Sequence, residues 1–510
     1  MIDQRRVTLW LFLLFQALYA LTSSGNAFRV PDEFEVYYQV EHLIDEGDLS
    51  IPQTISSGMF FGRIGVDGKP YAPYGPLAAV LSVPHHLAAR GVALLAGIPR
   101  DHTVWTFVVS GLTMLSTSTA AALAVAGFHR AATTLGAPPS AALLLSLMLG
   151  AASVLWTYAT NFYSEAWQAA AFTWAAVFLL ERRITSASML LAFAGLIKVT
   201  SLVFAPGFLV AVLMDRTVPI ERRLRGATSI AAALAVAVAT HFAWNTFRFG
   251  DVFEFGYDWG ETIPVPPARA FLLSELPRGL AVLLVTPGKS ILLWAPLLLL
   301  GISRLRTCPR PLLWGLATTS IAGLIFYGAY LFPDGGYAHG PRHLVPIVPL
   351  LLLPAATPGP PWRRELVTAC AAIGAVIALL SVSVSFLQDQ ALGDDFQSVG
   401  YYERIEPAPG RAWNRYRLGY IPFIRTTASP DWPVSSVVGT GLDFFLLHLT
   451  RAKATVPAAA AIPGWLPLTL FLGWSALLMS AAAALWPAVR LIGQDSRTLN
   501  FAAVSPVHSR

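Results

Sequence analysis

The sequence predicts an all-α protein that crosses a membrane many times. Of its 510 residues, 55% are hydrophobic and only 13% are charged, and the mean hydropathy is +0.57. Soluble domains carry about 25% charged residues, so this chain has too few charges to cover a water-exposed surface. An aromatic content of 12% excludes a disordered chain, which is poor in such residues. Apolar stretches of spanning length recur along the chain and predict a bundle of about 11–13 transmembrane helices.

The expected helices follow one another from the first residues to the last apolar stretch, marked by their length and lack of charge. They are residues 7–22, 75–97, 103–128, 140–159, 164–181, 187–197, 200–214, 227–247, 279–302, 312–332, 343–356, 366–386 and 461–490. Segments 75–97 and 103–128 lie between an outside and an inside loop, where an odd number of crossings is required. One of them is therefore expected not to cross fully, and 75–97 is the weaker because it contains Pro84 and Arg90.

Basic clusters set the orientation of the chain. Arg5 and Arg6 precede the first helix, and further arginine clusters separate later apolar segments, as expected for cytoplasmic loops. The net charge of +6 therefore indicates membrane topology and no nucleic-acid partner. A cleaved signal peptide ending near Gly25–Ala27 is the alternative for the first helix, but the many helices that follow favour an uncleaved one. We expect a multi-pass protein of the cell (inner or plasma) membrane.

Three regions are expected. Residues 1–386 form a transmembrane module with a long first extracytoplasmic loop, 23–72, which is acidic and carries an amphipathic helical stretch. Residues 387–460 form a small extracytoplasmic segment, the only long stretch of soluble-like composition. Residues 461–510 hold the final transmembrane helix and a tail.

Adjacent carboxylates open the first loop, in Arg29-Val-Pro-Asp32-Glu33-Phe-Glu35. Just outside the first helix, Asp32 and Glu33 suit a general base and its partner. The structural alternative is a capping box, with Asp32 as the N-cap of a helix and Glu35 as its third residue. The two interpretations are compatible, because a cap also fixes the position of a carboxylate.

Further along the loop, Lys69 and Tyr74 lead into the next apolar segment. They suit a grip on a lipid phosphate, and equally an interfacial aromatic belt with a snorkelling lysine.

Polar residues at membrane depth are the other candidates. Charge there costs at least ~2.5–3.5 kcal/mol, which makes Glu165 and Lys198 functional candidates unless they simply pair with each other or Lys198 snorkels to the interface. Arg342 suits bidentate phosphate binding, or an interfacial anchor, and it lies beside His339 and His343.

Several motifs occur in a fixed order along residues 1–390. They are the dibasic N-terminus, Pro31-Asp32-Glu33, Gly47-Asp48, Gly68-Lys69-Pro-Tyr71, Asn245–Asp251 with Phe255-Gly-Tyr257, Thr286–Ser290 with Trp294-Ala-Pro296, and Gly335–Arg342 followed by His-Leu. Together they resemble the C superfamily of glycosyltransferases (GT-C). The resemblance is closest to the bacterial polyprenyl-phosphate-sugar-dependent branch, related to protein O-mannosyltransferases and lipid A aminoarabinose transferases, and it covers roughly residues 1–390.

The resemblance implies transfer of a sugar, with inversion, from a polyprenyl-phosphate donor to a glycan, lipid or protein hydroxyl outside the cytoplasm. Asp32 and Glu33 would be the catalytic carboxylates. Lys69, Arg342 and Lys198 would bind the donor phosphate, and Tyr74, Glu165, His339 and His343 would contact substrate. No cofactor is required, although the acidic loop offers ligands for a divalent metal. The alternatives are a transporter or flippase of lipid-linked sugars, which predicts an internal repeat and a midplane site, and a non-catalytic envelope assembly factor.

Overall fold

A computed structural model describes residues 3–25, 27–56, 60–257, 270–336, 338–383, 442–455 and 460–495. Nearly all of its regular structure is helical. The α-helices are α1 (Gln4–Thr22), α2 (Pro31–Asp45), α3 (Gln53–Ser56), α4 (Pro76–Leu95), α5 (Thr103–Thr113), α6 (Leu115–Thr134), α7 (Pro139–Ala151), α8 (Val154–Ala159), α9 (Glu165–Leu180), α10 (Ile184–Ile197), α11 (Pro206–Met214), α12 (Ile220–Phe249), α13 (Leu276–Leu284), α14 (Ile291–Trp294), α15 (Leu298–Ser303), α16 (Arg310–Gly328), α17 (Val348–Leu352), α18 (Arg364–Ser383), α21 (Phe445–Thr455) and α22 (Trp465–Asp495). Short 3₁₀ helices are η1 (Val199–Phe204), η3 (Leu273–Glu275), η4 (Arg342–Ile347) and η5 (Leu353–Ala356), and one hairpin pairs β1 (Arg63–Ile64) with β2 (Pro70–Tyr71).

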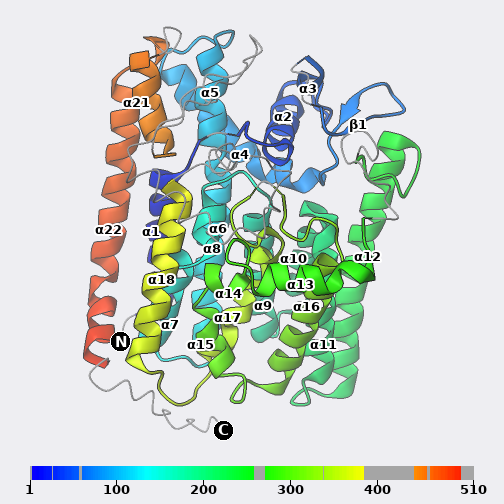
Figure 1. Ribbon diagram of the computed structural model, residues 1–510, viewed down its shortest axis with the longest axis vertical. Coiled ribbons are helices and arrows are strands. Elements are labelled where there is room, and N and C mark those ends of the chain that lie inside the picture. The colour runs from blue at the N-terminus through cyan, green and yellow to red at the C-terminus, as the bar shows by residue number, and fades with distance from the viewer. Residues whose placement is uncertain are drawn as a thin grey trace.

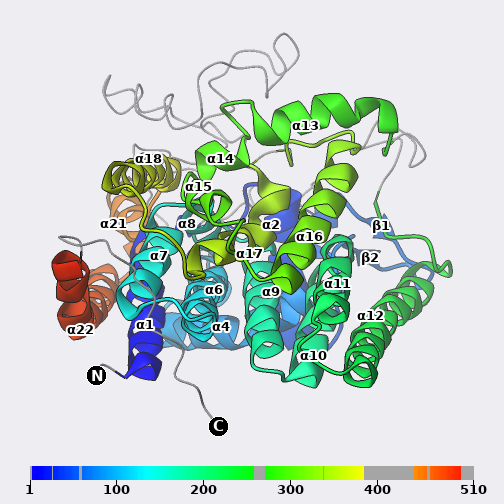
Figure 2. The ribbon, with the colours of Figure 1, turned by 90° about the horizontal axis from the view of Figure 1, so that it is seen from below.

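The long helices run side by side and form the body of the molecule. Figure 1 shows α12 and α22 on opposite flanks, with α2, α3 and β1 gathered at the upper end. From below, α6 and α9 occupy the middle of the bundle (Figure 2). The first loop therefore covers one end of the helices, as the sequence predicts.

Six helices in the described part of the chain are long and apolar enough to cross a bilayer. They are Pro76–Leu95, Val104–Thr134, Ile220–Phe249, Arg310–Gly328, Arg364–Ser383 and Trp465–Arg490. Four apolar helical stretches are shorter: Pro139–Ala151, Ile184–Ile197, Val199–Met214 and Arg342–Ala356. These findings establish an all-α multi-pass membrane protein. One of the segments 75–97 and 103–128 was expected not to cross fully, but the corresponding helices Pro76–Leu95 and Val104–Thr134 are both long enough to span a bilayer.

Several expected single spans are broken in the structure. Segment 279–302 becomes α13, α14 and α15, interrupted at Pro287-Gly288 and near Pro296, where a helix loses backbone hydrogen bonds. Segment 140–159 ends as α7 and restarts as α8, because the Ser153 hydroxyl accepts a hydrogen bond from the N–H of Leu155 (3.2 Å) and caps the new helix.

Small residues explain the central position of α6. Its sequence is rich in Ala, Ser and Thr, and nearly every residue from Leu115 to Ala132 is buried. Small side chains let helices approach closely where lipid provides no hydrophobic driving force. Helix α6 accordingly packs against α1 and α9, and the three form the core of the bundle.

The extracytoplasmic segment expected at 387–460 lies largely outside the described residues, since 384–441 and 456–459 are not described. Within it, α21 packs Phe445 into a core with Phe107 and Leu466. Helix α22 begins close to the expected start of the final span, at Trp465.

Candidate functional site

Helix α2 carries the acidic residues and starts two residues earlier than the predicted capping box requires. Its N-cap is Val30, which makes no side-chain cap, and Pro31 occupies the first helical position, a place that suits its fixed φ. The prediction of Asp32 as N-cap is therefore wrong. Asp32 and Glu33 instead lie in the first turn, where carboxylates interact favourably with the helix dipole.

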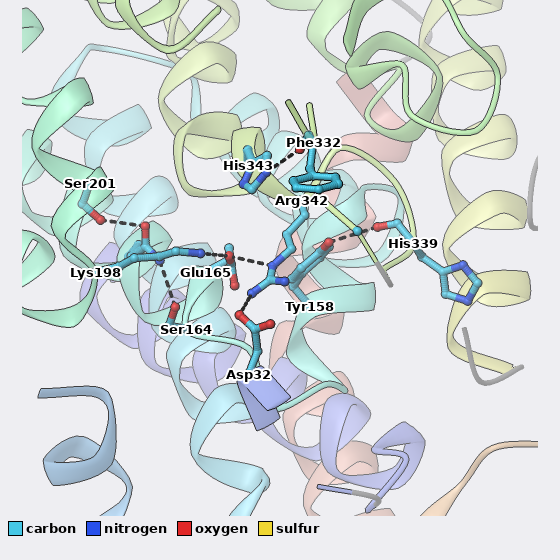
Figure 3. Close-up of polar contacts among 12 residues, drawn as sticks. Asp32, Tyr158, Ser164, Glu165, Lys198, Ser201, Phe332, His339, Arg342 and His343 are labelled. Atoms are coloured by element: carbon cyan, nitrogen blue, oxygen red, sulfur yellow. Dashed lines mark hydrogen bonds and ion pairs between the residues drawn. The ribbon is translucent and has the colours of Figure 1, made fainter. Parts of the chain in front are cut away.

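Asp32 opens a chain of four charged side chains (Figure 3). The Arg342 guanidinium contacts the Asp32 carboxylate, and its Nε donates to Glu165 Oε1 at 2.9 Å. The same Glu165 oxygen accepts from Lys198 Nζ at 2.9 Å. The pairing of Glu165 with Lys198, one interpretation of the sequence, is thus confirmed, and Arg342 joins the pair to Asp32.

Lys198 and Arg342 both lie where a helix is interrupted or begins, and this local backbone geometry directs their side chains into the site. Lys198 is extended (φ −153°, ψ 123°) between α10 and η1, so it leaves the helical path. Arg342 begins η4 after a glycine-rich turn. Gly335 has φ +77°, and a Cβ there would lie 2.7 Å from the Arg342 Cβ, so only glycine fits beside this arginine.

An aromatic ring supports the arginine. The Arg342 guanidinium carbon lies 4.0 Å from the ring centroid of Tyr163, a cation–π contact. Arg342 is only 8% exposed at its side chain, whereas Asp32 is 27% exposed. Asp32 is therefore the member of the chain that is most open to a ligand.

Glu33 points to a different set of partners and is fully buried. Its carboxylate accepts from Arg29 Nε (2.9 Å) and from the N–H of Phe162 (2.9 Å). Arg29 also donates to Asn161 Oδ1 and pairs with Asp443 at 3.5 Å. The structure therefore does not place Glu33 beside Asp32 in one site. It holds the turn that leads into Glu165.

Glu35 is a further buried carboxyl on the same helix. The N–H of Phe61 donates to its Oε1 at 2.9 Å. Burial raises the pKa of this carboxyl well above its ordinary value, and the hydrogen bond from Phe61 only partly opposes that effect. Sequence reasoning considered this residue only as part of a cap.

Lys69 lies apart from the charged chain. Its Nζ donates to Asp48 Oδ2 at 2.7 Å, and half of its side chain is exposed. Burial tends to raise the pKa of the Asp48 carboxyl, but hydrogen bonds from Lys69 and Ser50 outweigh it and lower that pKa to about 2. The structure thus gives Lys69 a carboxylate partner on the loop and does not bring it to Arg342.

A narrow cavity of about 30 Å³ lies beside Asp32, room for about one water molecule. Tyr74 and Lys198 line it, as does Tyr257 from a motif of the sequence resemblance. Arg248 also lines it and was missed as a candidate. This arginine is 2% exposed and donates to the Ala72 carbonyl (2.6 Å) and to Asn245 Oδ1 (2.9 Å).

Arg248 differs from the other cations of the site. Among the described residues, no carboxylate forms an ion pair with it; Trp244 and Phe249 flank its guanidinium, with ring centroids at 4.9 and 4.6 Å. A buried charge without a counter-charge is costly unless something else compensates it. The sequence placed Arg248 in a motif but gave no sign of its burial. We call Asp32, Glu165, Lys198, Arg248 and Arg342 the Asp32 site.

The two predicted histidines pack on aromatic rings. His343 stacks on Tyr327 (centroids 4.3 Å apart), and its Nε2 lies 3.3 Å from the Phe332 carbonyl. The His339 ring points away from Arg342 (Figure 3) and stacks on Trp294 at 6.0 Å. Lys289 Nζ donates to the Ala338 carbonyl at 2.7 Å, so two motifs of the resemblance meet here.

A divalent metal is the one inorganic ligand that the sequence left open. Within the described residues, no group of three or more His, Cys, Asp or Glu side chains has the arrangement of a metal site. The carboxylates of the Asp32 site are instead engaged by Arg342 and Lys198.

No protein-family model matches the sequence, and no curated protein sequence matches it. Among solved structures, the chain is similar to ArnT from Cupriavidus metallidurans in the apo state, with a TM-score of 0.47 and 14% identity over 93% of this chain and 76% of that chain. It is likewise similar to ArnT from the same organism bound to undecaprenyl phosphate, with a TM-score of 0.46 and 13% identity over 94% and 77% of the two chains. At these identities and TM-scores the similarity assigns no role to any residue of the site.

Proposed function

We propose that the protein is a membrane glycosyltransferase that moves a sugar from a polyprenyl-phosphate donor to an acceptor hydroxyl, with inversion at the anomeric carbon. The observation that carries the proposal is one partly exposed carboxylate, Asp32, set among the cations Lys198, Arg248 and Arg342. The motif resemblance to GT-C enzymes supports the same reaction class.

The charge of the site suits a phosphodiester. Three cations face two carboxylates, Asp32 and Glu165, which leaves one excess positive charge. A sugar linked through phosphate to a lipid carries one negative charge at that phosphate. Arg342 and Arg248 offer planar donors, which match phosphate oxygens better than a point charge does.

The reaction needs a base and a stabilised leaving group. The acceptor oxygen attacks the anomeric carbon, the bond from that carbon to the phosphate oxygen breaks, and its electron pair stays on the phosphate. The acceptor proton passes to Asp32, a step worth typically 10²–10⁴-fold. Asp32 then becomes neutral while the departing phosphate monoester gains negative charge, about −1.5 to −2 in all, so the excess of cations rises as the leaving group needs it.

In this proposal Glu33 and Lys69 position other parts of the chain and contact neither the acceptor nor the donor phosphate. Glu33 positions the turn before Glu165 through Arg29 and Phe162. Lys69 holds the first loop through Asp48. The catalytic face is the one covered by the first loop, outside the cytoplasm, and the cavity must widen to admit a sugar, because its present volume is about 30 Å³.

The test is sugar transfer by the purified protein in proteoliposomes. Radiolabelled polyprenyl-phosphate sugars are supplied with an envelope fraction from cells that lack the protein, and incorporated label is counted. We expect transfer by the wild type, about 10²–10⁴-fold less by Asp32→Asn, and normal transfer by Glu46→Gln, which removes an exposed carboxylate just beyond the end of the same helix.

Equal label in the presence and absence of wild-type protein, across the set of donors, would contradict the proposal. Transfer of intact donor across the bilayer without incorporation would favour the transporter alternative instead.

A further inference from the structure

A second, larger cavity lies among the helices, away from the Asp32 site. Its volume is about 470 Å³, within the range of about 300–1,000 Å³ typical of ligand pockets. Helices α9, α11 and α16 form its walls, with Leu179, Phe208, Ala211, Val212, Leu312 and Leu316 among the apolar residues that line it. We call it the Arg222 cavity.

The Arg222 cavity lies at the opposite end of α9 from Glu165. Helix α9 has 16 residues, so its two ends lie roughly 24 Å apart at 1.5 Å per residue. Glu165 begins the helix in the Asp32 site, whereas Leu179 and Leu180 at its end line the cavity. A phosphate bound at the rim of this cavity is therefore not the phosphate bound at the Asp32 site.

One rim of the cavity is basic. Arg182, Arg222 and Arg223 line it together with a single carboxylate, Asp215. Arg182 pairs with Asp215 and donates to the Thr217 hydroxyl at 3.1 Å, which neutralises one cation. Arg223 donates one Nη to the Leu213 carbonyl at 2.7 Å, and Arg222 is exposed. Two positive charges remain over an apolar slot.

The backbone of Arg182, on this rim, adopts a strained left-handed conformation. Arg182 has φ 62°, and in the described residues it is the only residue other than glycine with a positive φ. It follows the end of α9, where the N–H of Arg183 reaches back to the Phe178 carbonyl, a position that glycine usually fills. A strained arginine at such a place points to a need for its side chain.

We propose that the Arg222 cavity binds one anionic phospholipid of the cytoplasmic leaflet. An acyl chain fills the slot between α9, α11 and α16, and the phosphate lies against Arg222 and Arg223. Apolar walls together with an excess of arginine select a lipid over a water-soluble anion, and basic pockets between transmembrane helices on the cytoplasmic side are typical anionic-lipid sites. The orientation follows from the arginine clusters of this end.

Native mass spectrometry of the full-length, delipidated protein tests the proposal. The probes are phosphatidylglycerol and phosphatidylcholine with identical acyl chains. We expect one tightly held phosphatidylglycerol per protein, at least tenfold tighter than phosphatidylcholine, and a loss of about fivefold or more in that affinity for Arg222→Gln. The matched control is Arg216→Gln, an exposed arginine of the loop just before α12 that does not line the cavity.

A cavity-filling variant tests whether the acyl chain of the lipid lies in the Arg222 cavity. Leu312→Trp is expected to abolish the adduct, while Leu313→Trp, one residue along α16 and outside the lining, keeps it. Should Leu312→Trp fail to fold, the difference in phosphatidylglycerol affinity between Arg222→Gln and Arg216→Gln still tests the proposal. Equal binding of the two lipids, an unchanged affinity in Arg222→Gln, or an adduct that survives in folded Leu312→Trp would each overturn the proposal.

Discussion

Two neighbouring residues of one helix enter two different ion networks. Asp32 joins Arg342, Glu165 and Lys198 beside a cavity, and 27% of its side chain is exposed. Glu33 joins Arg29, Asn161 and Asp443, and none of its side chain is exposed. The first network is open on one side, whereas the second is closed.

The difference shows that two acidic residues adjacent in the sequence need not have equivalent roles in the structure. An open carboxylate can exchange its partner for a substrate proton, but a closed one can only lose stability when disturbed. A buried ion pair broken at one partner is strongly destabilising. The two residues are thus expected to fail in different assays.

Asp32→Asn should produce the largest change. The side chain keeps its shape and can still contact Arg342, but it no longer accepts a proton. We expect sugar transfer to fall by about 10²–10⁴-fold while the melting temperature stays near that of the wild type. Transfer rates and thermal unfolding are measured on the same preparation, and near-normal transfer would remove the base from the mechanism.

Glu33→Gln should show the opposite pattern. It leaves the buried Arg29 without its nearest counter-charge, which costs about 3 kcal/mol or more of the free energy of unfolding. Transfer per folded molecule should remain close to wild type. A double variant, Arg29→Met with Glu33→Leu, should be more stable than Glu33→Gln, and the reverse order in thermal unfolding would show that this network is not a closed pair.

Arg342→Lys keeps the charge but loses the planar fork that joins Asp32 to Glu165. Losing one charge-assisted hydrogen bond, about 1.5–3 kcal/mol, should reduce transfer by roughly 10–100-fold. The comparison is sharpened by donor affinity, measured by competition with unlabelled donor, which should weaken together with the rate. An unchanged affinity and rate would assign Arg342 to anchoring alone.

Glu35→Gln is expected to change pH dependence more than activity. Because burial raises the pKa of Glu35 in the folded protein, that protein keeps a proton which the unfolded chain releases near the ordinary value of 4.5. The resulting stability is complete below 4.5 and decreases as the pH rises above it. The fall in melting temperature between pH 5 and pH 8 should be smaller in Glu35→Gln, and an identical fall would contradict this assignment.

Lys69→Ala should have the smallest effect. Lys69 contacts Asp48 on a water-exposed part of the loop, and such pairs contribute little. We expect donor affinity within twofold of wild type in the same competition assay. A clear loss of affinity would restore the phosphate-binding role that the sequence suggested.

Composition and apolar length predicted the fold class because both are local properties. The helical spacing of apolar and acidic residues in the first loop predicted helix α2. Pairing of Glu165 with Lys198 was one of the interpretations that the sequence left open, and the structure shows this pair. The breaks within 279–302 and 140–159 were missed, although Pro287, Pro296 and Ser153 signal them. Apolar segments identified by length alone run through proline and serine residues that end or restart a helix.

The arrangement of the site was less accessible. Asp32 and Arg342 are 310 positions apart, and no periodicity connects them. Asp32 and Glu33 point in different directions because both lie inside α2, where successive residues are about 100° apart around the helix axis. Arg248 looked like an ordinary residue at a helix end, since burial of an arginine leaves no mark in its neighbours.

The contact between Arg29 and Asp443 has a consequence for biosynthesis. Arg29 emerges from the ribosome early, whereas Asp443, which also binds His448, belongs to the last part of the chain. At about 5–20 residues per second, Arg29 and Glu33 must wait tens of seconds for this partner. Until then Arg29 lacks its contact with Asp443, so a nascent chain that stalls before Asp443 would expose an incomplete ion network to the quality-control proteases of the membrane.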